Sequence, residues 1–283
     1  MKKPWKIILP CVLLLAILVV WTLWGNTALQ VSEYHIVSDR IPQGFDGFGI
    51  AQISDLHNAE FGEENEALIA LLSRTEPDII VLTGDLIDSR KTDIDIALDF
   101  VRQAMEIAPV YYVSGNHESR VGEYVLLKAG MEEIGVAVLE NRKVQIIREG
   151  EHITLMGIDD PSFRADYLFG DAATVARWEI ENQRSDSDGY TILLSHRPEL
   201  FDLYVDTGMD LVFSGHAHGG QFRLPFLGGL VAPNQGFFPR YDAGRFTEDN
   251  TTMIVSRGVG NSIFPIRFNN RPEIVLVTLD NSN

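Results

Sequence analysis

Short apolar runs, each ending in a polar cluster, recur along this chain and constrain what it can fold into. The segments 48–53, 79–82 and 110–113 are mainly apolar and of strand length, as buried parallel strands are. Between them, 63–74 and 94–107 carry apolar residues at helical spacing. Three strand–loop–helix units, roughly thirty residues apart, match repeated βαβ units. The N-terminal half is therefore predicted to be α/β.

The second half is predicted to be richer in strands. Residues 144–147 and 153–158 flank a polar turn that contains glycine, which is typical of a hairpin. A helix is expected over 172–181, and the Gly-, Pro- and Phe-rich segment 219–241 is expected to be an ordered loop. Further strands are expected at 191–194, 210–213, 253–256 and 274–279.

The N-terminal segment has the composition of a membrane anchor. An uncharged, mainly apolar stretch from 7 to 29 is long enough, as a helix, to cross a hydrocarbon core of roughly 30 Å. Trp21 and Trp24 lie near its far end, where an interfacial aromatic belt is expected. The lysines before it favour a cytoplasmic N-terminus, with the rest of the chain outside the cytoplasm: Lys2, Lys3 and Lys6.

A cleaved secretory signal is the alternative, with 26–28 as a poor cleavage site. Both interpretations place the remaining chain outside the cytoplasm. Cys11 is the only cysteine, so no disulfide forms within the chain. Because no linker separates two globular parts, we expect an anchor or signal at 1–30, a connector at 31–48 and one globular domain at 49–283.

The charge balance excludes one class of partner. The formal net charge is −17, from 23 basic and 40 acidic side chains. Non-specific nucleic-acid binding relies on Lys and Arg that neutralise phosphates, so no nucleic-acid partner is expected. The same balance argues against a broad electrostatic grip on anionic lipid. A phosphate substrate would need another source of positive charge, and bound metal cations would provide it.

Polar motifs follow five of the predicted strands directly. The carboxyl ends of strands in open α/β sheets line the ligand crevice, so these motifs can converge. Five of the seven histidines fall within them, and residues two apart on an extended segment point the same way. Taken singly, most of these motifs are more typical of a turn, cap or loop than of a ligand site, although Gly-His-x-His is more telling; together they predict a shared metal site. The motifs are Asp55-Leu56-His57, Gly84-Asp85-Leu86-Ile87-Asp88, Gly115-Asn116-His117-Glu118, Ser195-His196 and Gly215-His216-Ala217-His218.

Mixed imidazole and carboxylate ligands suit Mn, Fe, Zn or Co better than Mg or Ca, which prefer oxygen alone. The number of ligands exceeds one tetrahedral site and fits two divalent transition-metal ions that share a carboxylate. Two such ions can bind a bridging hydroxide and polarise a phosphoryl oxygen, which predicts hydrolysis of a phosphate ester.

These motifs, in this order, resemble those of the calcineurin-like metallophosphoesterases from about residue 49 to 279. Three further cues resemble the bacterial membrane-associated branch: Ser195-His196-Arg197-Pro198, Gly219-Gly220-Gln221 and Arg271-Pro272-Glu273. The resemblance implies a four-layer α/β/β/α sandwich with two mixed sheets.

The resemblance also implies roles for individual residues. One metal would be bound by Asp55, His57 and His218, with Asp85 as the bridge to a second. Asn116, His196 and His216 would complete the second site.

Two catalytic residues are implied as well. His117 would assist the leaving group or stabilise the transition state, and Asp88 would orient it. The alternative for Asp88 is a helix N-cap. Arg90, Arg120 and Arg197 lie near the motifs and either bind phosphate or form exposed ion pairs.

The resemblance leaves the substrate open. The anchor favours a phosphodiester or pyrophosphate at the membrane, lipid-linked or from the cell wall. A phosphomonoesterase or protein phosphatase with the same site is the first alternative, and a non-catalytic membrane-bound metal-binding module is the second. Packing in the core or a loop is favoured for four apolar residues over lining a substrate groove or touching the bilayer: Phe237, Phe238, Phe264 and Ile266.

Overall fold

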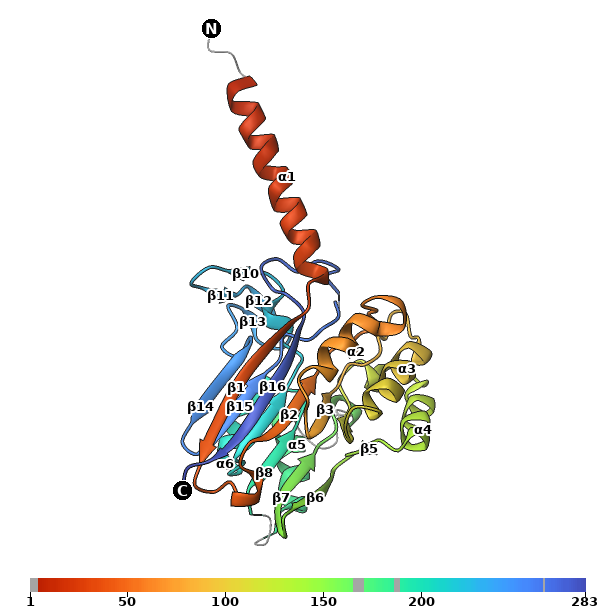
Figure 1. The fold of residues 1–283 in the computed structure, drawn as a ribbon, viewed down its shortest axis with the longest axis vertical. Coiled ribbons are helices and arrows are strands. Elements are labelled where there is room, and N and C mark those ends of the chain that lie inside the picture. Colours follow the sequence, from red (N-terminus) through yellow and green to blue (C-terminus); the bar gives the residue numbers. More distant parts are fainter. Residues whose placement is uncertain (1–4, 165–170, 186–188, 262) are drawn as a thin grey trace.

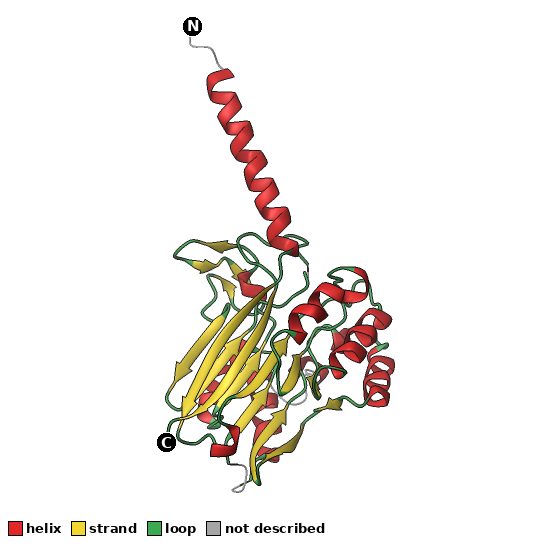
Figure 2. Cartoon of the chain, viewed as in Figure 1, coloured by secondary structure: helices red, strands yellow, loops and turns green. Residues whose placement is uncertain are grey.

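Two six-stranded mixed sheets lie face to face with helices on their outer faces (Figures 1 and 2). This arrangement comes from a computed structural model that describes residues 5–164, 171–185, 189–261 and 263–283. The predicted four-layer α/β/β/α architecture is confirmed.

The first sheet has the order β1-β16-β2-β3-β4-β5, with β16 antiparallel to β2 and the other neighbours parallel. Its strands are β1 (Gln30–Ser38), β2 (Phe48–Ile53), β3 (Ile79–Thr83), β4 (Val110–Val113), β5 (Ala137–Val138) and β16 (Glu273–Asn281).

The second sheet has the order β14-β15-β9-β8-β7-β6, parallel in its centre and antiparallel at both edges. Its strands are β6 (Arg142–Arg148), β7 (Glu151–Gly157), β8 (Thr191–Leu194), β9 (Leu211–Ser214), β14 (Gly244–Glu248) and β15 (Thr251–Val255). The predicted hairpin is therefore confirmed as β6 and β7.

Helices cover the outer face of each sheet. The first sheet packs against α2 (Glu66–Ser73), α3 (Ile94–Met105) and α4 (Tyr124–Ile134). The second packs against α5 (Ala172–Gln183) and α6 (Phe201–Asp206). The N-terminal helix α1 (Trp5–Thr27) projects from one end of this body (Figure 1).

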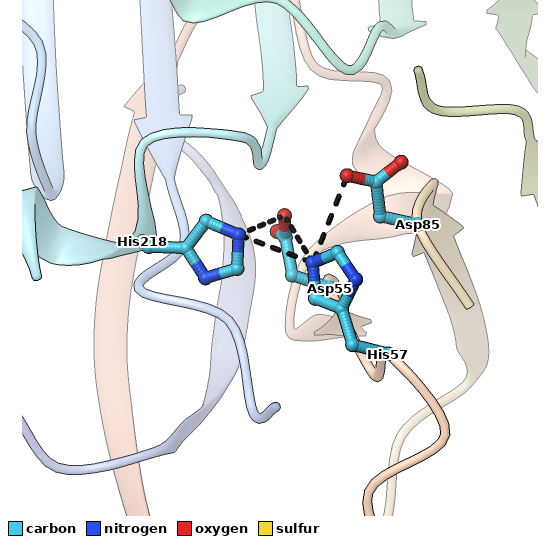
Figure 3. Close-up of side chains that lie close together, drawn as sticks. All are labelled: Asp55, His57, Asp85 and His218. Atoms are coloured by element: carbon cyan, nitrogen blue, oxygen red, sulfur yellow. Dashed lines mark hydrogen bonds and ion pairs between the residues drawn. The ribbon is translucent and has the colours of Figure 1, made fainter. Parts of the chain in front are cut away.

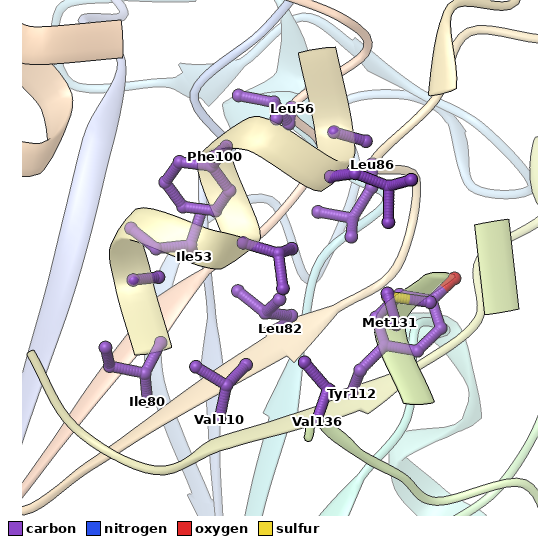
Figure 4. Packing of buried hydrophobic residues seen from close by; sticks show 14 of the residues in the cluster. Ile53, Leu56, Ile80, Leu82, Leu86, Phe100, Val110, Tyr112, Met131 and Val136 are labelled. Atoms are coloured by element: carbon purple, nitrogen blue, oxygen red, sulfur yellow. The ribbon is translucent and has the colours of Figure 1, made fainter. Parts of the chain in front are cut away.

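The layers follow from the alternation of side chains along each strand. In β3, Ile80 and Leu82 face the helices (Figure 4), whereas Ile79 and Val81 face the opposite sheet. Successive side chains of a strand point to opposite faces, so a wholly apolar strand fills two cores at once. That is why β3 carries no polar residue from Ile79 to Leu82, before the polar residues at its carboxyl end.

Two segments differ from the expectation. The proposed connector 31–48 contains most of β1, which pairs in parallel with β16 along its whole length. An edge strand is half exposed and can be as polar as a linker, so the composition of β1 did not distinguish it from a connecting segment. Segment 219–241 is ordered, as expected, but it holds two small hairpins: β10 (Arg223–Leu224) with β11 (Gly228–Gly229), and β12 (Val231–Ala232) with β13 (Gly236–Phe237).

Within the described chain, α1 is the helix that is long and apolar enough to cross a membrane. Its apolar span runs from Ile8 to Thr27 with a mean hydropathy of 2.5, and nearly all of it is exposed. The predicted topology signal from Lys2 and Lys3 lies outside the described residues. The division into an anchor and one catalytic domain stays a prediction.

The core between the sheets is expected to supply much of the stability. Phe213 in β9 is fully buried there, so Phe213→Ala should lower the free energy of unfolding by about 3–5 kcal/mol. Ile147 is 71% exposed on β6, and Ile147→Ala should change the free energy of unfolding by about 0.5 kcal/mol or less. Urea unfolding in detergent micelles measures both. Equal losses for the two variants would contradict this placement of the core.

Candidate metal centre

The polar motifs meet at the carboxyl ends of strands from both sheets. Loops after β2, β3 and β4 come from the first sheet, and loops after β8 and β9 come from the second. The structure brings all seven predicted ligand residues together, each no more than 6% exposed: Asp55, His57, Asp85, Asn116, His196, His216 and His218. Their assignment as ligands stays a prediction.

One group surrounds Asp55 and contains His57, Asp85 and His218 (Figure 3). His218 Nε2 lies 3.2 Å from Asp55 Oδ1 and 3.1 Å from His57 Nε2. His57 Nε2 lies 3.7 Å from Asp85 Oδ2. Four side chains from three loops therefore direct their ligand atoms at one point, all within 4.8 Å of one another.

A second group contains Asp85, His196 and His216. His196 Nε2 lies 3.2 Å from Asp85 Oδ2 and 3.1 Å from His216 Nδ1. Asn116 lines the adjoining pocket, and its buried Oδ1 has no hydrogen-bond partner. Asp85 belongs to both groups, as a bridging carboxylate would.

The backbone reaches this arrangement differently from the expectation. Asp55, His57, His216 and His218 have φ values of 54°, 47°, 65° and 48°, so these motifs are not extended segments. Tight left-handed turns, and not the alternation of a strand, bring the paired side chains together. Such backbone is costly for residues other than glycine and tends to occur at functional sites.

Glycine in these motifs provides room as well as turns. Gly84 has the expected positive φ of 89°. A Cβ on Gly115 would lie 2.3 Å from Asp85 Oδ1, and one on Gly215 would lie 1.9 Å from Ser54 Oγ. Any side chain at Gly115 or Gly215 would therefore displace the carboxylates or their hydrogen-bond partners.

Outer hydrogen bonds orient the ligand side chains. Nδ1 of His196 lies 2.7 Å from the Thr83 carbonyl, so the proton sits there and Nε2 is left for Asp85 or a metal. The His117 backbone N–H donates to Asp85 Oδ1 at 2.8 Å. Ser54 Oγ donates to Asp55 Oδ2 at 2.6 Å.

Glu118 is a positioning residue that the sequence reasoning did not identify. Its fully buried carboxylate accepts from the backbone N–H of Asp85 at 2.9 Å and of Gly115 at 2.7 Å. It therefore ties the loop after β3 to the loop after β4. Burial and the nearby Asp85 raise the pKa of Glu118 to about 8. The signal was its place directly after Asn116-His117, but one acidic residue cannot be distinguished from a surface residue without the fold.

The electrostatics favour neutral imidazoles at His57, His216 and His218, and a protonated His196 beside an anionic Asp85. Burial lowers the pKa of His57 to about 3 and holds those of His216 and His218 well below their usual value. Burial would also lower the pKa of His196, but Asp85 raises it to about 10. Burial would raise the pKa of Asp85, but His196 and His57 bring it well below its usual value.

The residues present fit a divalent metal. Neutral imidazole and carboxylate are the donor set of transition-metal sites. Nitrogen atoms that face one another at 3.1 Å, beside a buried Asn116 oxygen without a protein partner, are arranged as they would be around a bound cation.

His117 is held in one tautomer by the loop after β3. The Ser89 backbone N–H donates to its Nδ1 at 3.0 Å, so Nε2 carries the proton. Asp88 lies farther away, with Oδ1 3.7 Å from His117 Nδ1, and accepts from Arg90 Nε at 2.9 Å. Asp88 does not cap α3, because Asp93 does. The predicted catalytic roles of His117 and Asp88 stay predictions.

A pocket of about 350 Å³ opens beside the two groups. Arg197 lies at the pocket wall and is only 7% exposed. Its guanidinium Nη2 donates to Asp160 Oδ1 at 2.8 Å. Arg120 also lines the pocket, whereas Arg90 is engaged by Asp88. The lining comprises Asp85, Asn116, His117, Arg120, Pro161, Ser162, Ala172, Arg197, His216, His218, Pro233, Asn234 and Ile263.

Buried imidazoles and carboxylates at the strand ends of an α/β/β/α sandwich define a metallophosphoesterase. The calcineurin-like phosphoesterase family matches residues 48–220. The chain belongs to this family, and phosphoester hydrolysis is the activity that its fold and site support.

Its relatives agree with that assignment. The chain is 30% identical over 260 residues to metallophosphoesterase YkuE of Bacillus subtilis (strain 168), covering 90% of this chain and 87% of that protein. It is 29% identical over 237 residues to phosphodiesterase YaeI of Escherichia coli (strain K12), covering 82% of each. It is 28% identical over 259 residues to a transmembrane protein with metallophosphoesterase domain of Danio rerio, and the match covers 88% of this chain and 57% of that protein.

Metal binding should release a proton and weaken as the pH falls. His196 has a pKa of about 10 without metal, and only its neutral form is a ligand, so the proton must leave. Because one proton is released when the metal binds, the affinity for metal should fall about tenfold for each unit by which the pH is lowered from about 9 to 7. Calorimetry with Mn²⁺ in buffers of different ionisation enthalpy measures the released protons. His196→Gln should remove one of them, and unchanged proton release in that variant would contradict the assignment.

Proposed function

We propose that this protein hydrolyses a phosphodiester or pyrophosphate at a membrane through a dinuclear metal centre. The observation that carries the proposal is Asp85, whose carboxylate belongs to both ligand groups. One side holds Asp55, His57 and His218, and the other holds His196, His216 and the unpaired Asn116 oxygen.

Two divalent ions at these groups would be Mn, Fe, Zn or Co by the chemistry of the donors. When bound, they would supply Lewis acidity toward the phosphoryl oxygens and lower the pKa of a water nucleophile. They would also supply the positive charge that the protein as a whole lacks.

The chain's own groups then position the substrate. His117 offers its Nε2–H at the pocket, in the tautomer fixed by Ser89, for the phosphoryl or leaving-group oxygen. Arg120 and Arg197 add two guanidinium groups to the pocket wall. Arg197 is oriented by Asp160, so it meets a phosphate without first losing side-chain freedom.

Diester cleavage is favoured over monoester cleavage by the relative named phosphodiesterase YaeI. A phosphomonoesterase would use the same metal ligands. A non-catalytic metal-binding module is disfavoured, because structural metal sites are closed, and this one adjoins an open pocket with His117 at its wall.

Action at the membrane is supported by α1 and by the relative named as a transmembrane protein. The lysines that precede α1 place the catalytic domain outside the cytoplasm in this proposal. Lipid-linked or cell-wall phosphate esters are therefore the substrates we expect.

The full chain in detergent, stripped of metal and reloaded with Mn²⁺, Zn²⁺, Co²⁺ or Mg²⁺, tests the reaction directly. Bis-p-nitrophenyl phosphate should be cleaved faster than the monoester, and only with metal. Substitutions of residues that only support metal ligands typically lower activity about 10–100-fold. Asp85→Asn should lower the rate of diester cleavage by more than that, because it removes a ligand shared by both metals. Preference for the monoester would replace the diesterase proposal with the phosphomonoesterase. No turnover of either by metal-loaded protein would contradict both.

His117→Ala separates an enzyme from a binding module. The variant should bind metal as the parent does, because its ring is absent from the proposed ligand set. Turnover should fall about 10²–10⁴-fold, the usual contribution of a positioned acid or base. Metal content by mass spectrometry and initial rates of diester cleavage measure the two effects. An unchanged rate would remove His117 from the mechanism.

A further inference from the structure

Seven large apolar side chains are exposed on three neighbouring loops at the α1 end of the body. Their exposed fractions run from 49% for Ile266 to 107% for Phe226. We call this set the apolar rim: Phe226, Leu227, Phe237, Phe238, Ile263, Phe264 and Ile266. The prediction that four of them pack in the core or a loop is therefore wrong. Clustered apolar side chains left in water mark an interaction site.

Buried polar groups hold the rim loops in place. The Gln221 side-chain amide donates to the Phe264 carbonyl at 2.9 Å and to the Ile266 carbonyl at 2.7 Å. Arg267 is 1% exposed, and its guanidinium donates to the Arg257 carbonyl at 2.8 Å. Gln221 also lies only three residues after His218, so the turn that carries a candidate ligand also anchors the rim.

The loop that carries Ile263, Phe264 and Ile266 continues into residues that bind the end of α1. Asn26 Nδ2 donates to the Arg267 carbonyl at 2.9 Å, and the Arg267 N–H donates back to Asn26 Oδ1 at 2.8 Å. Arg271 Nε donates to the Ala28 carbonyl at 2.7 Å, and its guanidinium lies 5.0 Å from the Trp24 ring centroid. The helix is thus docked on the body instead of hanging from a free linker (Figure 1).

The rim reaches the level of the apolar span. Pro265 and Ile266 line one hollow together with Leu18, Val19 and Leu23 of α1. At 1.5 Å per residue, Leu18 lies about 13 Å along the helix from Thr27. Parts of the rim therefore lie beside the last turns of the helix and not below its end.

We propose that the apolar rim is a second membrane-contact surface, inserted at the headgroup–acyl boundary of the bilayer that α1 spans. Trp21 and Trp24, with rings 5.4 Å apart, mark that boundary on the helix at the same level. The contact is apolar, because a chain of net charge −17 gains nothing from anionic lipid. Burial of the rim in lipid removes apolar surface from water.

This surface would hold the mouth of the catalytic pocket at the lipid headgroups. Ile263 belongs to the rim and also lines the pocket, and Pro233 at the mouth lies four residues before Phe237. Placement of the pocket mouth at the headgroups rests on the proposed function, and it narrows the substrate to phosphate esters carried by membrane lipids. The contact itself can be tested without any turnover.

The test uses the full chain, with Cys11→Ser as background, in vesicles of phosphatidylcholine. Single cysteines replace Phe237 (75% exposed) or Phe226 on the rim, Pro233 at the mouth, or the control Ile147 (71% exposed), and carry an environment-sensitive fluorophore. Ile147 belongs to β6, a strand at the end of the body away from α1 (Figure 1).

Rim labels should shift to the blue and lose most of their emission to nitroxides on the acyl chains. The Pro233 label should be quenched more by nitroxides on the headgroup, and the Ile147 label by neither. The pattern should persist at high salt, because the contact is apolar. Rim labels that stay unquenched, or that are quenched no more than Ile147, would overturn the inference. Loss of diesterase activity alone would leave it standing, so its failure and that of the proposed function are distinguishable.

Discussion

The Asp85 carboxylate is the point on which the rest of the structure depends. It lies on a loop of the first sheet, yet its nearest imidazole, His196 at 3.2 Å, comes from the second sheet. The two groups therefore exist only when both sheets pack face to face through the core that includes Val81 and Phe213. Each of these two groups takes ligand residues from both sheets, so the candidate metal centre is complete only when the sheets are packed together.

Buried strands and their polar ends could be predicted because each residue there has one dominant constraint. Ile79 to Leu82 must be apolar to fill two cores, and the motif after them must be polar to face the crevice. The proximity of Asp55 and His57 was predicted from an extended backbone. The two side chains do lie together, but left-handed turns bring them there.

Features whose meaning depends on distant neighbours could not be predicted. Strand β1 is half polar at the sheet edge, and Glu118 becomes informative only when its carboxylate meets backbone N–H groups of two loops. Arg197 is identified as a buried pocket residue only by its pairing with Asp160, more than thirty positions away. Phe237 appeared to be a packing residue because aromatic composition does not reveal which face of the protein is solvent.

The proposed metal ions would explain how an acidic protein can act on an anionic substrate. Local positive charge would come from these ions and from Arg120 at the pocket wall, while the bulk charge stays negative. Electron paramagnetic resonance of the Mn²⁺-loaded full chain, with the bound metal counted, tests the bridging role of Asp85 most directly. The account predicts two ions per chain and the spectrum of a coupled pair, which Asp85→Asn converts to that of an isolated ion. One ion per chain with an uncoupled spectrum in the parent protein would contradict it.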